Sequence, residues 1–157
     1  MLFCLILNFS FSKRDHHARD FYEVYYPESN MFWGIWNTGF WIDENQPEAK
    51  IAYSGFHFHY PLIGGRFQRS ADYININECT KCRYVDFKRS KDSIRRDPNF
   101  ENWILNLSFS NIDYIVIDST ITPGVKSYEE EWAQSYPEDF QLVKKYNSTV
   151  IYKFLER

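Results

Sequence analysis

A continuous apolar stretch near the middle of the chain, IDYIVIDS at 112–119, constrains the fold more than any other feature. An uninterrupted run of Ile, Val and Tyr is typical of a strand that is covered on both faces, as the strands of parallel sheets are. Helices usually supply that cover. The stretch therefore favours an α/β protein in which helices lie on both sides of a sheet.

Three segments have the patterns of helices. Apolar residues recur at three- and four-residue spacing within 27–43, which predicts a helix that buries a broad face. Asp97 precedes a proline and an apolar pattern that continues to Leu107, so Asp97 is predicted to cap the N-terminus of a second helix. Ser127 and Glu130 form a capping box, which predicts a short third helix.

Extended patterns alternate with these helices. Short apolar runs predict strands at 49–55 and 71–77, and two alternating runs about a turn at Asn147 predict a hairpin near the C-terminal end. The order of strands and helices predicts an α/β fold with a mostly parallel sheet flanked by helices and with a C-terminal antiparallel β-hairpin.

Length and charge limit the organisation and the partners of the chain. Its 157 residues carry a formal net charge of −3 and have the composition of a folded protein, with 44% hydrophobic residues. We expect one α/β domain at 20–157, because this is the size of an ordinary domain. The acidic balance excludes DNA and RNA as main partners, since nucleic-acid binding needs a broad basic surface.

Residues 1–19 are expected to form an apolar N-terminal segment with a linker. The first twelve residues, MLFCLILNFSFS, are too few to cross a bilayer alone, because a spanning helix needs about 20 apolar residues. They fit either a buried start of the domain or the truncated end of a membrane helix. Lys13 and Arg14 follow directly, and the positive-inside tendency counts against an extracytoplasmic position for what comes after them.

The sequence contains no motif of a known enzyme site. Gly55 and Gly64 are too far apart for a dinucleotide-binding turn, and the chain has neither a G-x-x-x-x-G-K-[ST] phosphate loop nor a G-x-S-x-G nucleophile elbow. We therefore predict no catalytic residue and no cofactor on this chain.

The stretch SGFHFHYPLIGGRF at 54–67 and the sequence CTKC at 79–82 raise the question of a metal. His57, His59, Cys79 and Cys82 could together bind zinc, because Cys and His at such spacings are zinc ligands. A single C-x-x-C is a weak signal, so the first prediction is that no metal binds and the four-ligand zinc site is the alternative. The two cysteines could instead form a disulfide or remain free thiols.

A basic segment occupies 81–96, KCRYVDFKRSKDSIRR, with seven basic residues against two aspartates. It fits either a solvated loop or a surface that contacts phosphate, on anionic lipids or on a lipid-linked phosphosugar. The residues predicted for this lipid or phosphate surface are Lys88, Arg89, Lys91, Arg95 and Arg96.

Three groups of residues resemble, in their content and order, the C-terminal extracytoplasmic domain of polytopic GT-C glycosyltransferases. The first group is KIAYSGFHFHYPLIGGRFQRSADYIN, and its similar positions are Ile51, Ala52, Tyr53, Gly55, Tyr60, Pro61, Leu62, Gly64, Tyr73 and Ile74. The second and third groups are NWILNLSFSNIDYIVIDS and PEDFQLVKKYNSTVIYKFL. The resemblance extends over residues 20–155.

This resemblance implies a non-catalytic domain of a membrane enzyme of the protein-mannosyltransferase or lipid A aminoarabinose-transferase type, which transfers a sugar from a polyprenyl-phosphate donor. In such enzymes the catalytic acid lies in an early loop between membrane helices, a region that this chain does not contain. The domain is expected on the extracytoplasmic, periplasmic side of a membrane. Its implied partners are the membrane portion of the enzyme, which it supports, a lipid-linked sugar or acceptor, and the membrane surface.

The aromatic stretch at 54–67 is the expected contact for a saccharide, because its rings either pack against the helices or present flat faces to sugar rings. The predicted substrate-binding residues are His57, His59, Tyr60 and Arg66. A protein of a different class remains open: a freestanding domain that binds a small molecule or a glycan, with or without zinc.

Overall fold

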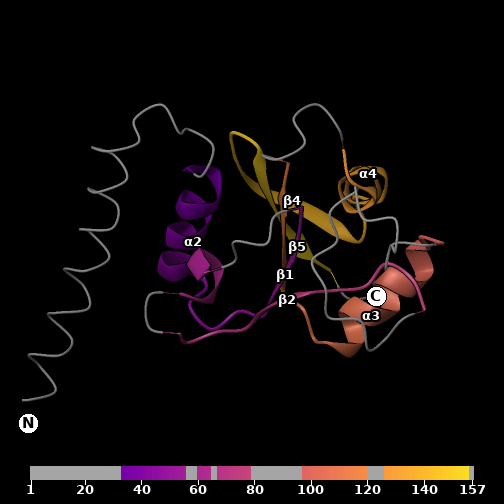
Figure 1. Cartoon of the computed structure of the whole chain (residues 1–157), viewed down its shortest axis with the longest axis horizontal. Coiled ribbons are helices and arrows are strands. Elements are labelled where there is room, and N and C mark those ends of the chain that lie inside the picture. The colour runs from indigo at the N-terminus through magenta and orange to yellow at the C-terminus, as the bar shows by residue number, and fades with distance from the viewer. Residues whose placement is uncertain (1–32, 56–59, 65–66, 79–96, 120–125, 156–157) are drawn as a thin grey trace, which may run out of the picture.

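A five-stranded sheet with the strand order β2-β1-β3-β5-β4 runs through the middle of the protein (Figure 1). The computed structural model describes residues 33–55, 60–64, 67–78, 97–119 and 126–155. The strands are β1 (Ile51–Ser54), β2 (Ala71–Tyr73), β3 (Tyr114–Asp118), β4 (Phe140–Tyr146) and β5 (Thr149–Phe154).

The sheet is mixed. Strands β2, β1 and β3 are parallel, whereas β5 is antiparallel to both of its neighbours, β3 and β4. The α/β class and the C-terminal antiparallel hairpin are thereby confirmed. The parallel part is smaller than expected, because two of the four strand pairings are parallel and two are antiparallel. The hairpin turns at Asn147, whose φ of 49° is one that asparagine tolerates well.

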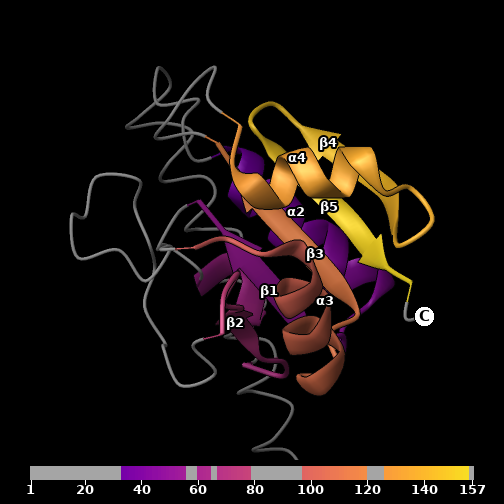
Figure 2. The same ribbon diagram turned by 90° about the vertical axis from the view of Figure 1, so that its right-hand side faces the viewer.

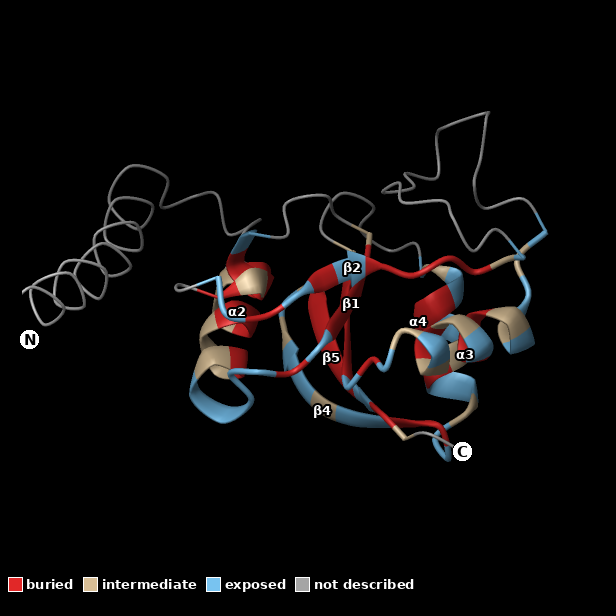
Figure 3. Cartoon of the chain, turned by 90° about the horizontal axis from the view of Figure 1, so that it is seen from below, coloured by how far each residue is buried: buried red, intermediate tan, exposed pale blue. Residues whose placement is uncertain are grey.

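Helices cover both faces of the sheet (Figures 1 and 2). Helix α2 (Trp33–Asn45) and the short 3₁₀ helix η1 (Tyr60–Ile63) pack on one face, and helices α3 (Phe100–Phe109) and α4 (Tyr128–Ser135) pack on the other. Figure 3 shows the buried residues concentrated on the sheet and on the helix faces that meet it.

Strand β3 lies at the centre of the sheet, and all five of its residues are buried. Its side chains alternate between the two cores: Ile115 and Ile117 pack with α3 and α4, whereas Tyr114 and Val116 pack with α2. This two-sided burial is the physical reason for the uninterrupted apolar run in the sequence.

The core on the α3 and α4 side is rich in aromatic rings. Trp103 of α3 is 1% exposed and stacks on Phe140 at the start of β4, with ring centroids 5.1 Å apart. Phe100 stacks on Tyr136 after α4 with a centroid distance of 4.0 Å. These contacts join α3, α4 and the hairpin into one packed unit, because aromatic pairs of this geometry add to the free energy of burial.

The start of α3 differs from the expectation. Asn99, not Asp97, is the N-cap: its side-chain oxygen accepts a hydrogen bond from the backbone N–H of Asn102 at 2.9 Å. Asp97 lies two residues further upstream with a left-handed φ of 55°. The predicted cap of α4 is confirmed, since the hydroxyl of Ser127 accepts from the N–H of Glu130 at 3.2 Å.

The second predicted strand is shorter than its apolar pattern. Strand β2 ends at Tyr73, and the chain beyond it is held by α3 instead of by another strand. The side-chain amide of Asn106 donates to the carbonyl oxygens of Asn75 and Asn77, at 2.9 and 3.2 Å. The N–H of Asn99 donates to the carbonyl oxygen of Ile76 at 2.7 Å.

Two glycines let α2 approach its neighbours closely. A β carbon on Gly34 would lie 2.9 Å from the carbonyl oxygen of Tyr146 and would also overlap the side chain of Thr149. A β carbon on Gly39 would lie 2.9 Å from the carbonyl carbon of Pro61 and overlap its oxygen. Glycine is therefore required at both positions despite its low helix propensity.

Candidate functional site

The carboxyl ends of β1 and β3 form the first candidate site. These adjacent parallel strands leave the sheet toward opposite faces, because β1 leads to η1 on the α2 side and β3 leads to α4 on the other side. In open α/β sheets, such a divergence at the carboxyl edge is where ligands usually bind.

A buried carboxylate lies at this edge. Asp118, the last residue of β3, is 4% exposed, and its Oδ1 accepts long hydrogen bonds from the hydroxyls of Ser148 and Thr149, both at 3.4 Å. Ser119 is tied to the hairpin turn, since its N–H and its hydroxyl both donate to the carbonyl oxygen of Ser148, at 2.9 and 3.0 Å. No pattern in the sequence indicates this cluster, because the two hydroxyls that donate to Asp118 come from the hairpin, about 30 residues away from the carboxylate.

The backbones of the two strands also come very close here. Gly55 has φ +95°, and a β carbon on it would overlap the carbonyl oxygen of Asp118 and lie 2.8 Å from its carbonyl carbon. Only glycine fits both the left-handed conformation and this approach. Gly55 therefore fixes the point at which the chain leaves β1.

Most of the predicted site residues lie outside the described residues. These are His57, His59 and Arg66 of the predicted substrate site, Cys79 and Cys82 of the zinc alternative, and Lys88, Arg89, Lys91, Arg95 and Arg96 of the predicted lipid or phosphate surface. Their roles remain predictions. Within the described ranges, no group of three or more His, Cys, Asp or Glu side chains could hold a metal ion.

Tyr60 is the one predicted substrate-binding residue that the structure describes. It is the first residue of η1 and is 61% exposed, and the nearby Phe67 is 71% exposed. Pro61 and Leu62, which follow Tyr60, are buried. Tyr60 therefore has an exposed side chain on a segment whose next two residues are buried.

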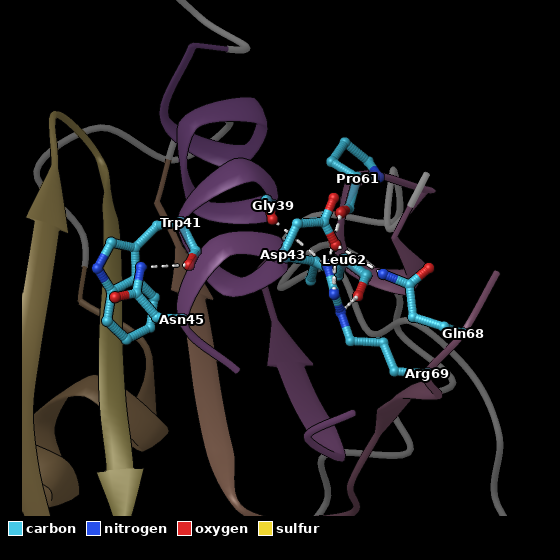
Figure 4. Close-up of polar contacts among 8 residues, drawn as sticks. All are labelled: Gly39, Trp41, Asp43, Asn45, Pro61, Leu62, Gln68 and Arg69. Atoms are coloured by element: carbon cyan, nitrogen blue, oxygen red, sulfur yellow. Dashed lines mark hydrogen bonds and ion pairs between the residues drawn. The ribbon is translucent and has the colours of Figure 1, made fainter. Parts of the chain in front are cut away.

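Arg69 anchors that segment (Figure 4). Its side chain is fully buried, and it forms an ion pair of 2.5 Å with Asp43 of α2. The guanidinium also donates to the carbonyl oxygen of Leu62 and makes longer contacts, of 3.4 Å, to those of Gly39 and Pro61. A buried arginine with a charged partner and several acceptors is a structural clamp, because each donor replaces a lost hydrogen bond to water.

A groove along the edge strand β2 is the second candidate site, and residues of β2 and α3 line it. Its volume is about 1120 Å³. The residues that line it come from β2, from the segment held by α3, and from one face of α3 itself. The sequence does not indicate this groove, because its apolar pattern predicts a strand through residue 77.

The walls of the groove combine apolar and polar groups. Leu105 and Phe109, which are 65% and 90% exposed, lie in this groove and leave much of their apolar surface in water. Asp72 and Asn102 supply a carboxylate and an amide. The pKa of Tyr53, which also lines the groove, is raised by burial and by the negative charge of Asp72, so its phenol stays neutral.

The fold defines the chain as a three-layer α/β protein with a mixed sheet. No protein-family model matches the chain, and no curated protein or solved structure is significantly similar to it. Among the described helices, none is both long enough and apolar enough to cross a membrane.

Proposed function

We propose that this chain is a non-catalytic α/β domain of a membrane glycosyltransferase that takes its sugar from a polyprenyl-phosphate donor. The observation that carries the proposal is the position of the GT-C-like residues in the fold. In the first group, the residues Ile51 to Tyr53 belong to β1, Tyr60 to Leu62 belong to η1, and Tyr73 ends β2. The described residues of this group therefore include β1, η1 and β2, which is the edge of the parallel part of the sheet with its covering 3₁₀ helix.

The other two groups also coincide with complete units. The second, at 102–119, includes most of α3 and all of β3, and the third, at 137–155, includes the β4–β5 hairpin. Many of the similar positions are buried, among them Ile51, Leu62 and Val116. This similarity to the GT-C domains supports a common scaffold, because buried positions determine a fold, whereas a reaction depends on the residues of a site.

The role proposed for the domain follows from this scaffold. It supports the membrane portion of the enzyme and helps to dock a lipid-linked sugar or the acceptor on the extracytoplasmic side. The catalytic acid belongs to the membrane portion. Tyr60 is a suitable contact for a saccharide, because its exposed ring is carried on a segment that Arg69 holds in place.

The genomic DNA upstream of the Met1 codon tests this proposal. We expect an open frame, continuous with this one, that encodes a series of apolar segments of about 20 residues each, as spanning helices require. An in-frame stop codon shortly before Met1, with no such segments, would contradict it.

A freestanding binding domain is the second candidate, and the groove beside β2 favours it, because a concave site with both apolar and polar walls is typical of ligand binding. Its zinc-containing form depends on His57, His59, Cys79 and Cys82. Metal analysis of protein purified without chelator tests that form, and less than about half an equivalent of zinc would exclude it, since a complete four-ligand site binds tightly.

A further inference from the structure

We infer that the groove between β2 and α3 binds a neutral saccharide of more than one sugar ring. This inference deepens the proposed function, on which it rests for the class of ligand, by naming the surface that docks the sugar. The groove is distinct from the predicted contact at Tyr60, which is not among its lining residues.

The apolar part of the groove suits the face of a sugar ring. Helix α3 directs Trp103, Ile104 and Leu107 into the core. Leu105 and Phe109 instead lie along the groove, and Phe109 is 90% exposed at the last position of the helix. An aromatic ring that a helix leaves in water can stack on the C–H groups of a pyranose ring, which are its apolar part.

The polar part of the groove suits hydroxyl groups. Asp72 is exposed on β2, and the carboxylate of Asp72 can accept two hydrogen bonds from neighbouring hydroxyls. The half-buried Asn102 on α3 adds an amide, which both donates and accepts. Each hydroxyl of a sugar both donates and accepts hydrogen bonds, so it can pair with a carboxylate and with an amide.

Charge selects against an anionic ligand. Asp72 and Glu78 are the charged residues among the described lining residues, which include no Lys, Arg or His. A phosphate or uronate would therefore meet like charge, with no compensating cation among these described residues. The volume of about 1120 Å³ exceeds the roughly 300–1,000 Å³ that is usual for a small-ligand cleft, so it has room for a short saccharide chain.

The test is a titration of the whole ¹⁵N-labelled chain followed by NMR. The probes are maltotriose, mannotriose and triacetylchitotriose as neutral trisaccharides, trigalacturonic acid as an anionic one, and an uncharged Thr/Val pentapeptide as a competitor for the edge strand. We expect at least one neutral trisaccharide to shift amide signals of β2 and α3 while the β4–β5 hairpin, on the other edge of the sheet, is unaffected.

Matched variants connect the binding to the groove. Phe109→Ala should weaken it about tenfold, the factor that corresponds to 1.4 kcal/mol. Phe67→Ala, which removes an exposed phenylalanine elsewhere, should change nothing. Both side chains are mostly in water, so both variants should fold.

Several results would overturn the inference. The first is that no neutral trisaccharide binds at about 10 mM, a concentration at which even millimolar affinity is visible. The second is that trigalacturonic acid or the peptide binds more tightly than the neutral trisaccharides. The third is that the wild type and Phe109→Ala bind with equal affinity. The reading frame upstream of Met1 decides the proposed function independently of these titrations, so the two failures can be told apart.

Discussion

Arg69 and Asp43, 26 residues apart in the sequence, form a 2.5 Å ion pair that joins the segment before β2 to helix α2. The guanidinium is fully buried, whereas the carboxylate is 30% exposed. Arg69→Met should lower the free energy of unfolding by about 3 kcal/mol, because several buried acceptors and a carboxylate lose their donor at once.

Asp43→Asn should cost less, about 1–2 kcal/mol, since water can reach the position of the carboxylate and the carbonyl acceptors of Arg69 remain. Lys145→Met on the exposed surface of β4 is the matched control and should change stability by less than about 0.5 kcal/mol. Urea denaturation measures all three variants. An Arg69→Met protein as stable as this control would show that the clamp does not hold the segment.

Gly55 and Ser54, neighbours at the end of β1, should respond to alanine in opposite directions. Gly55→Ala should destabilise the fold by at least about 2 kcal/mol, because φ is +95° and the new methyl group would overlap the backbone of Asp118. The buried hydroxyl of Ser54 has no hydrogen-bond partner among the described residues, so Ser54→Ala should stabilise the fold by about 1 kcal/mol. Thermal unfolding measures both changes, and a shift of the same sign in both variants would refute this account of the edge.

Alkaline pH should weaken the fold through its buried tyrosines. The pKa of Tyr53 is raised by burial and by Asp72, and that of Tyr152 is raised by burial and by Glu130 against the opposing hydrogen bond from Gln134. In the unfolded chain both phenols lose their protons near pH 10, before the folded state does. Their contribution to stability is therefore complete below about pH 10 and is lost as the pH rises above it.

Tyr53→Phe and Tyr152→Phe test this pH dependence, because each removes one titrating phenol and keeps its ring. The free energy of unfolding, measured by urea denaturation between pH 8 and 11 to bracket the phenol pKa, should fall less steeply with pH in each variant than in the wild type. Identical slopes in all three proteins would show that other groups cause the alkaline loss.

The local parts of the fold could be predicted from the sequence. The apolar run of β3, the capping box at Ser127 and the turn at Asn147 each depend on residues that are close in the sequence, and the structure contains all three. The predicted N-cap of α3 is wrong by two residues. Asp97 and Asn99 are both residue types that favour this position, and only the backbone conformation distinguishes them.

The candidate sites could not be predicted in the same way. The ion pair of Arg69 with Asp43, the hydroxyls around Asp118 and the amide bridge of Asn106 all join residues 25 or more positions apart. No periodicity encodes such contacts, since they arise when separate elements pack. The groove beside β2 exists for the same reason. The apolar pattern of residues 71–77 predicts a strand throughout, but Asn106 of α3 binds the carbonyl oxygens of Asn75 and Asn77 instead.

The basic segment at 81–96 predicts salt-sensitive binding to anionic vesicles. Each Lys or Arg near such a surface contributes about 1 kcal/mol of attraction, and a Debye length near 10 Å at 0.1 M salt screens it. Charge reversal at Lys88, Arg89 and Lys91 should remove most of the binding in a vesicle sedimentation assay. Binding that is indifferent both to salt and to the reversal would identify the segment as a solvated loop.

The size and location of the native gene product test the central claim most directly. An antibody raised against this chain, which has a mass of 19.0 kDa, is used on fractionated cells that express the gene from its own locus. We predict one band in the membrane fraction at a mass well above 19.0 kDa. Protease added to the extracytoplasmic side should digest the part of this protein that the antibody recognises. A band of 19.0 kDa in the soluble fraction would contradict the assignment to a membrane glycosyltransferase.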